Sequence, residues 1–280
     1  MRYLLLFLLV TGCSGCFRRF VRTPAQLREY FSQQKISPLF VTLRQDTVQL
    51  FCAVAGADTL PPLLVVHGAP GAWYGNRNLL TDSLVTSRFQ VISVDRPGYG
   101  QSWVNQRHGA VTSIATQSSV IRRALLLNKS HHPGIVLGSS YGGPIAAQLA
   151  LDTPAAFYRV ILLAAAADPA IEKFWWFNKY VHHGPLRWLL PRYLRTATDE
   201  KYAHAAQLRL LLPQWQRLAM PVFAVQGDAD KIVYPANLDF LQKVLTGRGS
   251  RIIRVPGAGH LIRMERPALV RDLLLEKESE

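Results

Sequence analysis

A serine flanked by glycines lies in the middle of the chain, where it could serve as a nucleophile. The segment Gly138-Ser139-Ser140-Tyr141-Gly142 follows an apolar run, residues 134–137, and precedes a run of small residues, 144–147. This order predicts a sharp turn from a strand into a helix, with glycines making room for a strained backbone at Ser140. Five residues alone do not separate a nucleophile from an ordinary Gly-rich turn. The hypothesis therefore depends on partners elsewhere in the chain.

A serine hydroxyl becomes an effective nucleophile when a base takes its proton and an acid orients that base. His260 ends a Gly-rich loop after the last predicted strand, and Asp230 lies in the loop after the penultimate one. We predict that His260 is the base and that Asp230 orients it. Asp228 on the same loop is an alternative acid, and Asp168 after the sixth predicted strand is a rival position.

Acyl transfer also requires hydrogen-bond donors for the oxyanion, and backbone N–H groups in a tight loop or at a helix start provide them. The amide of Tyr141, directly after the predicted nucleophile, is one candidate. The segment His67-Gly68-Ala69-Pro70-Gly71 follows a short apolar strand. We predict that the amide of Ala69 is the second donor.

Regularly spaced strands and helices would position these residues. Strands are predicted at 40–44, 47–54, 63–66, 89–94, 134–137, 160–163, 222–225 and 251–255, and helices at 23–33, 76–87, 112–128, 144–151, 236–246 and 267–277. A hairpin followed by alternating strands and helices predicts an α/β fold with a mostly parallel, eight-stranded sheet flanked by helices. Ligands of such sheets bind beyond the carboxyl ends of the strands. All the candidate residues are predicted at those ends.

One stretch, about residues 168–217, contains no strand pattern and is rich in aromatic residues, which predicts an inserted helical cap. It carries twice as many basic residues (Lys173, Lys179, Arg187, Arg192, Arg195, Lys201, Arg209, Arg217) as acidic ones (Asp168, Glu172, Asp199, Glu200). The cap is therefore expected to be basic.

Together these motifs resemble those of the α/β-hydrolase superfamily. The resemblance runs from about Leu39 to Leu275 and includes the segments 67–71, 95–100, 138–143, 227–230 and 259–260. It implies an α/β-hydrolase fold with the catalytic order Ser140, Asp230, His260. Dehalogenases and epoxide hydrolases of the superfamily carry an aspartate at the nucleophile position, whereas this chain carries Ser140. Proline iminopeptidases are also similar, but they use acidic cap residues to hold a substrate's amino terminus, and this cap is basic.

The amino terminus resembles an export signal. Arg2 precedes an apolar run, residues 3–10, that is too short to span a bilayer. The segment Val10-Thr11-Gly12-Cys13 resembles the lipobox of bacterial lipoproteins, in which the cysteine is lipidated. The resemblance implies a signal peptide at 1–12 and an exported protein anchored through Cys13 in the outer membrane or cell envelope. The patterns described above divide the remaining chain into a tether with an N-terminal helix at 13–38 and a hydrolase domain at 39–280 that contains the cap at about 168–217. A plain signal peptide or a wrongly chosen start codon are the alternatives.

Composition narrows the function classes further. The chain of 280 residues has a formal net charge of +14 and is 49% hydrophobic, which is ample for a sizeable core. The basic residues are spread along the chain and form no recognisable nucleic-acid module, so nucleic-acid binding is not expected. No metal-ligand spacing or phosphate-binding loop is present, so no cofactor or metal is predicted. Cys52, in a predicted strand, is expected to be a small buried residue.

These observations predict a serine hydrolase that cleaves a carboxylic ester of a small or medium substrate through an acyl-enzyme. Amide, peptide or carbon–carbon bond hydrolysis by the same residues is an alternative within enzymes. A membrane-tethered, non-catalytic binding protein on a hydrolase scaffold is an alternative of a different class. The expected partners are a small acyl substrate and the membrane surface, and no pattern indicates a particular oligomeric state.

Overall fold

A computed structural model of the chain describes residues 21–174, 178–245 and 249–276. The chain divides into two units, Met1–Ser37 and Pro38–Glu280. In the first unit, helix α2 (Pro24–Gln34) begins after Thr23, whose hydroxyl accepts from the N–H of Gln26 while the Gln26 side chain accepts from the N–H of Thr23. This reciprocal capping, with proline at the first helical position, explains why the predicted helix begins there.

The predicted signal peptide and the lipidation site Cys13 lie outside the described residues. Within the described part of the chain, no helix combines the length and the apolar character needed to cross a membrane.

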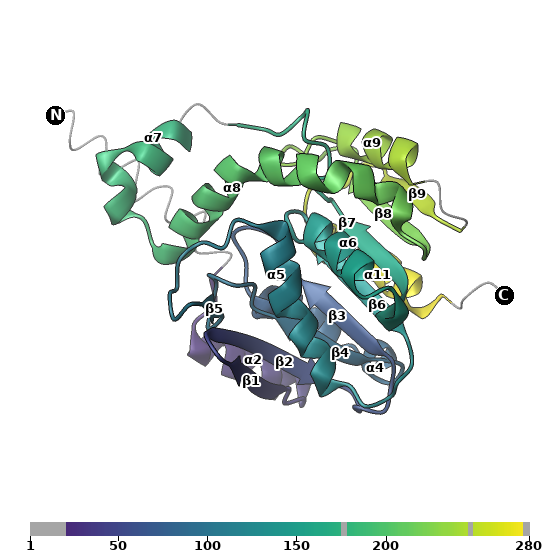
Figure 1. Ribbon diagram of the computed structural model, residues 1–280. Helices are drawn as coiled ribbons and strands as arrows, with labels where there is room; N and C mark the ends of the chain where they lie inside the picture. Colours follow the sequence, from purple (N-terminus) through teal and green to yellow (C-terminus); the bar gives the residue numbers. More distant parts are fainter. Residues whose placement is uncertain (1–20, 175–177, 246–248, 277–280) are drawn as a thin grey trace. The chain divides into compact units, whose positions relative to one another are not determined.

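The second unit is built on one mixed sheet (Figure 1). Its strands are β1 (Leu39–Gln45), β2 (Val48–Ala55), β3 (Pro62–Val66), β4 (Gln90–Val94), β5 (Trp103–Val104), β6 (Gly134–Ser139), β7 (Phe157–Leu163), β8 (Val222–Gly227) and β9 (Arg251–Val255). They lie in the order β1-β2-β4-β3-β6-β7-β8-β9, and β5 pairs with β2. The pairs from β4 to β9 along this order are parallel, and the pairs made by β2 are antiparallel. The predicted α/β, mostly parallel sheet is confirmed.

The number of strands differs from the prediction, because the described residues form a sheet of nine strands and not eight. The additional strand β5 consists of two residues that pair with Val48 and Gln49 of β2. Such a short strand has no alternating or continuous apolar run, so a pattern search does not find it.

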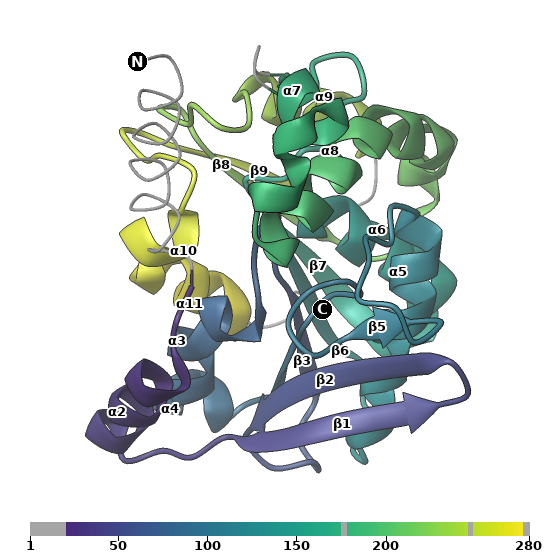
Figure 2. The same ribbon diagram turned by 90° about the vertical axis from the view of Figure 1, so that its left-hand side faces the viewer.

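Helices cover both faces of the sheet, as Figure 2 shows. One side carries α3 (Arg77–Thr81), α4 (Ser83–Thr86), α10 (Ile262–Glu265) and α11 (Pro267–Leu275), and the other carries α5 (Ile114–Ile121) and α6 (Gly142–Asp152). The apolar residues of α5 and α6 join those of α9 (Ala236–Val244) and of the central strands in one buried cluster. Burial of strands on both faces explains their near-continuous apolar sequences.

Two predicted helices are interrupted. The segment 76–87 is divided into α3 and α4 after the 3₁₀ helix η2 (Trp73–Asn76), because the carboxylate of Asp82 accepts the N–H groups of Leu84 and Val85 and starts a new helix. The segment 112–128 ends as the 3₁₀ helix η3 (Arg122–Leu127) after α5. Another 3₁₀ helix, η4 (Pro154–Ala156), precedes β7.

The predicted helical cap lies between β7 and β8. Its described residues form α7 (Asn178–His183), η5 (Pro185–Leu189), α8 (Arg192–Leu211) and η6 (Leu212–Arg217). In Figure 1, α8 runs beside the ends of α5 and α6. The buried residues of α8 recur every three or four positions (Thr196, Glu200, His204, Leu208, Leu211), so one helix face is buried, polar in its first half and apolar in its second.

Cys52 is a free cysteine in β2 and is fully buried, as predicted. Burial raises the pKa of its thiol, which keeps it protonated. Its role in the fold is that of a small core residue.

Candidate active site

Ser140 lies on a tight turn between β6 and α6, with a backbone φ of 53°. This left-handed conformation is costly for a non-glycine residue. Glycines make it possible, because a Cβ on Gly138 would lie 2.3 Å from the carbonyl oxygen of Gly142, and a Cβ on Gly142 would lie 2.5 Å from that of Val66. The strained turn predicted from the glycine spacing is therefore present, at the carboxyl end of a central strand.

His260 and Asp230 meet at the same edge of the sheet, although they come from different loops. The Nδ1 atom of His260 lies 2.8 Å from Oδ2 of Asp230. An ionised carboxylate only accepts hydrogen bonds, so Nδ1 carries a proton, and in the neutral form of the ring the lone pair is on Nε2. The Asp230 side chain is fully buried, whereas that of His260 is 13% exposed. The imidazole can therefore reach a substrate while its orienting acid cannot.

Asp230 is held in place by donors on both carboxylate oxygens. Its Oδ1 accepts the N–H groups of Ile232 (2.8 Å) and Val233 (3.0 Å), and Oδ2 also accepts from Gln226 Nε2 (2.7 Å). Burial acts to raise the pKa of Asp230, but the hydrogen bond and charge of His260 and the two backbone donors outweigh it. The pKa of Asp230 is therefore below its ordinary value, and the carboxylate stays ionised.

The two rival acids have other partners. Asp228 accepts the N–H of Gly257 at 2.7 Å, and Asp168 accepts the N–H of Ala170 at 2.8 Å. Neither carboxylate contacts the ring of His260 among the hydrogen bonds of the described residues. Of the three candidate acids, the structure brings only Asp230 to His260.

Two backbone N–H groups beside Ser140 remain available. Among the residues that the structure describes, the N–H groups of Ala69 and Tyr141 donate to no other group. The loop of Ala69 packs against the serine, since a Cβ on Gly68 would lie 3.0 Å from the Cβ of Ser140. Tyr141 is buried and Ala69 is partly buried. Enclosed N–H groups are seldom left without an acceptor, so two of them beside one hydroxyl fit a place for an oxyanion.

Ser140 and His260 are not joined by a hydrogen bond. Within the described part of the chain, the Ser140 hydroxyl has no hydrogen-bond partner, and His260 pairs only with Asp230. Contacts between a nucleophile and its base commonly tighten only when substrate binds. The structure thus brings the acid and the base together and leaves the serine unpaired.

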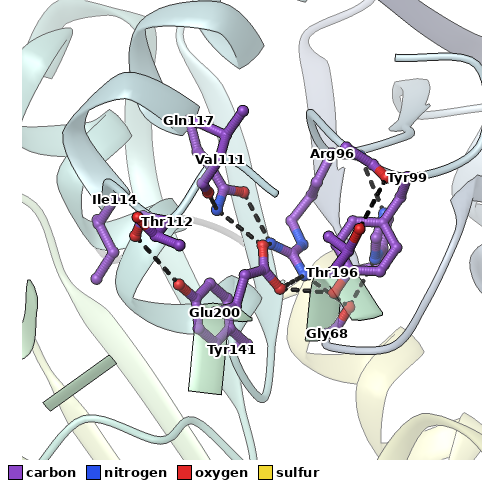
Figure 3. Close-up of polar contacts among 12 residues, drawn as sticks. Gly68, Arg96, Tyr99, Val111, Thr112, Ile114, Gln117, Tyr141, Thr196 and Glu200 are labelled. Atoms are coloured by element: carbon purple, nitrogen blue, oxygen red, sulfur yellow. Dashed lines mark hydrogen bonds and ion pairs between the residues drawn. The ribbon is translucent and has the colours of Figure 1, made fainter. Parts of the chain in front are cut away.

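A buried ionic network, shown in Figure 3, links this site to the cap. Arg96, at the end of β4, pairs with Glu200 of α8 through Nη1–Oε1 (2.6 Å) and Nη2–Oε2 (3.0 Å), and both side chains are fully buried. Tyr99 donates to Glu200 Oε2 (2.6 Å), and Gln117 Nε2 donates to Glu200 Oε1 (2.9 Å). Arg96 also donates to Gln117 Oε1 at 2.7 Å.

The network keeps Arg96 charged although its side chain is fully buried. Burial acts to lower the pKa of Arg96, but the negative charge of Glu200 outweighs burial and raises it above its ordinary value. Burial, followed by the charge of Glu200, raises the pKa of Tyr99 well above its ordinary value, so the phenol remains a donor.

We predict that Glu200→Leu lowers the free energy of unfolding by about 3–5 kcal/mol, because it leaves the Arg96 guanidinium buried without a counter-charge. Asp239→Ala is the control. It breaks the ion pair with Arg254, in which both side chains are about half exposed, and is expected to cost less than about 1 kcal/mol. Urea unfolding followed by circular dichroism measures both variants. An equal loss of unfolding free energy in the two variants would contradict the expectation that the buried Arg96–Glu200 pair matters more to stability than an exposed ion pair.

A second ionic group of the cap surrounds Glu172. Its carboxylate pairs with Lys201 and lies 3.1 Å from Nδ1 of His204. The His204 ring is buried and stacks on Tyr141 with 4.3 Å between ring centroids. A third cap acid, Asp199, pairs with Arg187 at 2.6 Å. Cationic side chains of the chain itself therefore neutralise these cap acids.

The sequence motifs did not reveal Glu200 or Gln226. Gln226 immediately precedes the acid loop, but a glutamine at the end of a strand has many uses. Glu200 lies 104 residues from Arg96 along the chain, and it stands among other charged residues of one helix. A signal was present at Arg96, because a charged residue that follows a buried strand within two positions requires a partner if it is buried.

Among the described residues, no group of three or more His, Cys, Asp or Glu side chains is placed to hold a metal ion. The chemistry available at this site is that of a hydroxyl, an imidazole, a carboxylate and backbone N–H groups.

Comparison with known proteins agrees with the fold. The family model described as alpha/beta hydrolase fold matches residues 61–210. The AB hydrolase superfamily protein YfhM of Bacillus subtilis (strain 168) is 28% identical over 116 residues, or 41% of this chain and 40% of that protein, so the chain matches well under half of this relative's length.

Two solved structures share the fold over most of their length. A membrane phospholipase A, described as a bacterial virulence factor, has a TM-score of 0.66 and 20% identity, covering 97% of this chain and 96% of that one. The 2-hydroxy-6-oxo-6-phenylhexa-2,4-dienoate hydrolase from Rhodococcus sp. strain RHA1 has a TM-score of 0.64 and 19% identity, covering 85% and 98%. At these identities the comparison establishes the likeness of fold.

Proposed function

Since the chain belongs to the alpha/beta hydrolase fold family, we propose that it is a serine hydrolase that cleaves carboxylic esters through an acyl-enzyme. The observation that carries this proposal is the 2.8 Å contact between Asp230 and His260 at the sheet edge that also carries the strained turn of Ser140. A nucleophile, a base and an orienting acid on three separate loops are the parts that such chemistry requires.

In the proposed reaction, Ser140 Oγ attacks the acyl carbon while His260 Nε2 takes the hydroxyl proton. Asp230 stabilises the resulting imidazolium, and the N–H groups of Ala69 and Tyr141 donate to the oxyanion. Collapse of this intermediate breaks the bond to the leaving alcohol, which receives the proton from His260. Water, activated by His260, then hydrolyses the acyl-enzyme. Each oxyanion donor in such sites is typically worth about 3 kcal/mol of barrier.

Apolar residues beside the catalytic loops favour a substrate with an apolar acyl or aryl part. Ile232 and Tyr234 follow Asp230 closely, and Leu261 and Met264 follow His260, and all four are exposed large hydrophobic residues. Exposed apolar side chains that gather near a site commonly contact a ligand. One solved structure of the same fold is a phospholipase A, which fits an ester with an apolar part.

The state of the cap acids weighs against an aminopeptidase. Recognition of a substrate's ammonium group requires a carboxylate that is not already neutralised. Three of the four cap acids, Glu172, Asp199 and Glu200, each pair with a cationic side chain of the chain itself, whereas the fourth, Asp168, accepts the backbone N–H of Ala170. The proposal therefore favours an acyl substrate without a free amino terminus.

A paired substrate assay tests the proposed bond type. The purified chain is given 4-nitrophenyl butyrate and proline 4-nitroanilide, which release chromophores of similar detectability. The proposal expects ester turnover with no comparable cleavage of the anilide. Faster cleavage of the anilide would favour the aminopeptidase alternative, and folded protein that turns over neither compound would favour the binding protein.

We also propose that the mature chain is a lipoprotein of the cell envelope, on the resemblance of residues 10–13 to a lipobox. Cys13→Ala is expected to lose incorporation of a clickable palmitate and to leave the membrane fraction. Cys16→Ala is the matched control, because it changes a cysteine three residues away, and it should keep both properties. Palmitate incorporation that persists in Cys13→Ala would contradict the proposal.

A further inference from the structure

The peptide between Gly68 and Ala69 is held by two side chains on its carbonyl side. The Gly68 oxygen lies 2.7 Å from His67 Nδ1 and accepts from Arg96 Nη2 at 3.1 Å. The Nε2 atom of His67 accepts the backbone N–H of Arg96 at 3.0 Å, so the ring carries its proton on Nδ1 and donates it to Gly68. Burial, helped by the charge of Arg96, lowers the pKa of His67, which keeps the ring neutral.

Fixing the carbonyl also fixes the N–H of Ala69. The Gly68–Ala69 peptide is trans, and in a planar trans peptide the C=O and N–H groups point in opposite directions. Two donors on the Gly68 oxygen therefore oppose rotation of the peptide and hold the Ala69 N–H on the opposite side, where it has no acceptor among the described residues.

The same guanidinium touches the residue that carries the other donor. The Cζ atom of Arg96 lies 4.8 Å from the centre of the Tyr141 ring and 4.7 Å from that of Tyr99. A guanidinium over an aromatic ring is attracted to its face. Arg96 thus contacts the carbonyl of the Gly68–Ala69 peptide and the side chain of Tyr141, the residue that carries the other unpaired N–H group beside Ser140, as Figure 3 shows for Gly68 and Tyr141.

The cap holds Arg96 in this position. Glu200 binds both terminal nitrogens of the guanidinium, and Gln117 accepts from Nη1 as well. A two-point contact between arginine and a carboxylate fixes the plane and the direction of the guanidinium. Because Glu200 belongs to α8, the position of the cap helix determines where the second donor to Gly68, Arg96 Nη2, is placed.

We propose that Arg96 is a positioning residue for the oxyanion hole and that Glu200 transmits the position of the cap to it. The inference rests on the proposed function, because it assigns the Ala69 and Tyr141 N–H groups to an oxyanion. The inference predicts that the cap helps to lower the barrier of the chemical step, although the cap does not touch the reacting atoms.

The test replaces the buried pair as a unit. Arg96→Met/Glu200→Leu removes both charges together, so no unpaired charge is left in the interior. We expect the folded double variant to lose about tenfold to a hundredfold in kcat for 4-nitrophenyl butyrate, with KM little changed, since complete loss of one oxyanion donor costs about 10²–10³. The inhibition constant of an alkyl trifluoromethyl ketone, which forms an oxyanion adduct with serine, should rise by a similar factor.

Arg159→Met is the matched control. Arg159 is another buried arginine that donates to main-chain carbonyls, those of Leu273 (2.9 Å) and Glu276 (3.0 Å), on the side of the molecule that carries α11. This variant should lose stability and keep the wild-type kcat in its folded fraction, which circular dichroism measures. A fall in kcat common to both variants would indicate a general structural effect and overturn the inference.

Arg96→Lys provides an independent test of the inference if the double variant does not fold. A lysine keeps the charge beside Glu200, but one ammonium group cannot reproduce the planar fork that reaches the carboxylate, Gln117 and the Gly68 carbonyl. It should show the same selective loss of kcat and of ketone affinity. Wild-type kcat in a folded Arg96 variant would overturn the inference, whereas a wild-type protein without esterase activity would mean that the proposed function itself is wrong.

Discussion

Ser140→Ala is expected to lower kcat/KM for 4-nitrophenyl butyrate by at least about 10⁴-fold, because it removes the attacking oxygen of the proposed mechanism. Alanine keeps the Cβ of serine, so the backbone at φ 53° experiences the same strain and the fold should be retained. The Ser140 hydroxyl makes no hydrogen bond in the described structure, so its loss leaves no buried partner unsatisfied. Initial rates over a range of ester concentrations, with circular dichroism of each protein, provide the measurement.

Ser139→Ala is the control, since Ser139 is the last residue of β6 and directly precedes the turn. It removes a hydroxyl from the neighbouring position and should change kcat/KM by no more than severalfold. Equal ester turnover by wild type and Ser140→Ala would contradict the mechanism. That outcome would favour a binding protein whose residual ester cleavage arises from other surface groups.

Asp230→Asn is expected to lower kcat by about 10⁴-fold. The asparagine oxygen can still accept the N–H groups of Ile232 and Val233, so the loop should keep its conformation. Its NH₂ group would face His260 Nδ1, which would favour the tautomer with the proton on Nε2 and remove the lone pair that takes the serine proton. Measuring kcat with 4-nitrophenyl butyrate tests this expectation.

Asp228→Asn and Asp168→Asn are matched controls for the choice of acid. Their carboxylates accept backbone N–H groups of Gly257 and Ala170, contacts that an asparagine oxygen can also make. Both variants should keep kcat within about tenfold of wild type, which is small against the loss of a triad member. If Asp168→Asn costs more than Asp230→Asn, the orienting acid is Asp168 and the assignment of Asp230 is wrong.

The predictions from sequence succeeded where the physical cause is local. The strained turn at Ser140 depends on glycines two residues away, and the apolar strands of the central sheet are continuous because both faces are buried. The cap could be predicted because the stretch at about residues 168–217 contains no strand pattern. The catalytic roles of Ser140, Asp230 and His260 remain predictions that the experiments above test.

Features that depend on contacts between distant parts of the chain could not be predicted from the sequence. The Arg96 and Glu200 pair joins two segments far apart in the chain, and its ionic character emerges only when α8 folds over the sheet. Strand β5 exists because two residues happen to lie beside β2. One local feature was also missed, because the division of residues 76–87 into separate helices depends on the capping preference of Asp82, which competed with the apolar pattern around it.

Covalent labelling of the wild-type chain with a fluorophosphonate tests the central claim most directly, because such compounds react with a serine that has a working base and oxyanion site. Intact-mass spectrometry followed by peptide mapping should find the adduct on Ser140, and Ser140→Ala should not acquire it. Folded wild-type protein that acquires no adduct at Ser140 would contradict the assignment of this chain as a serine hydrolase.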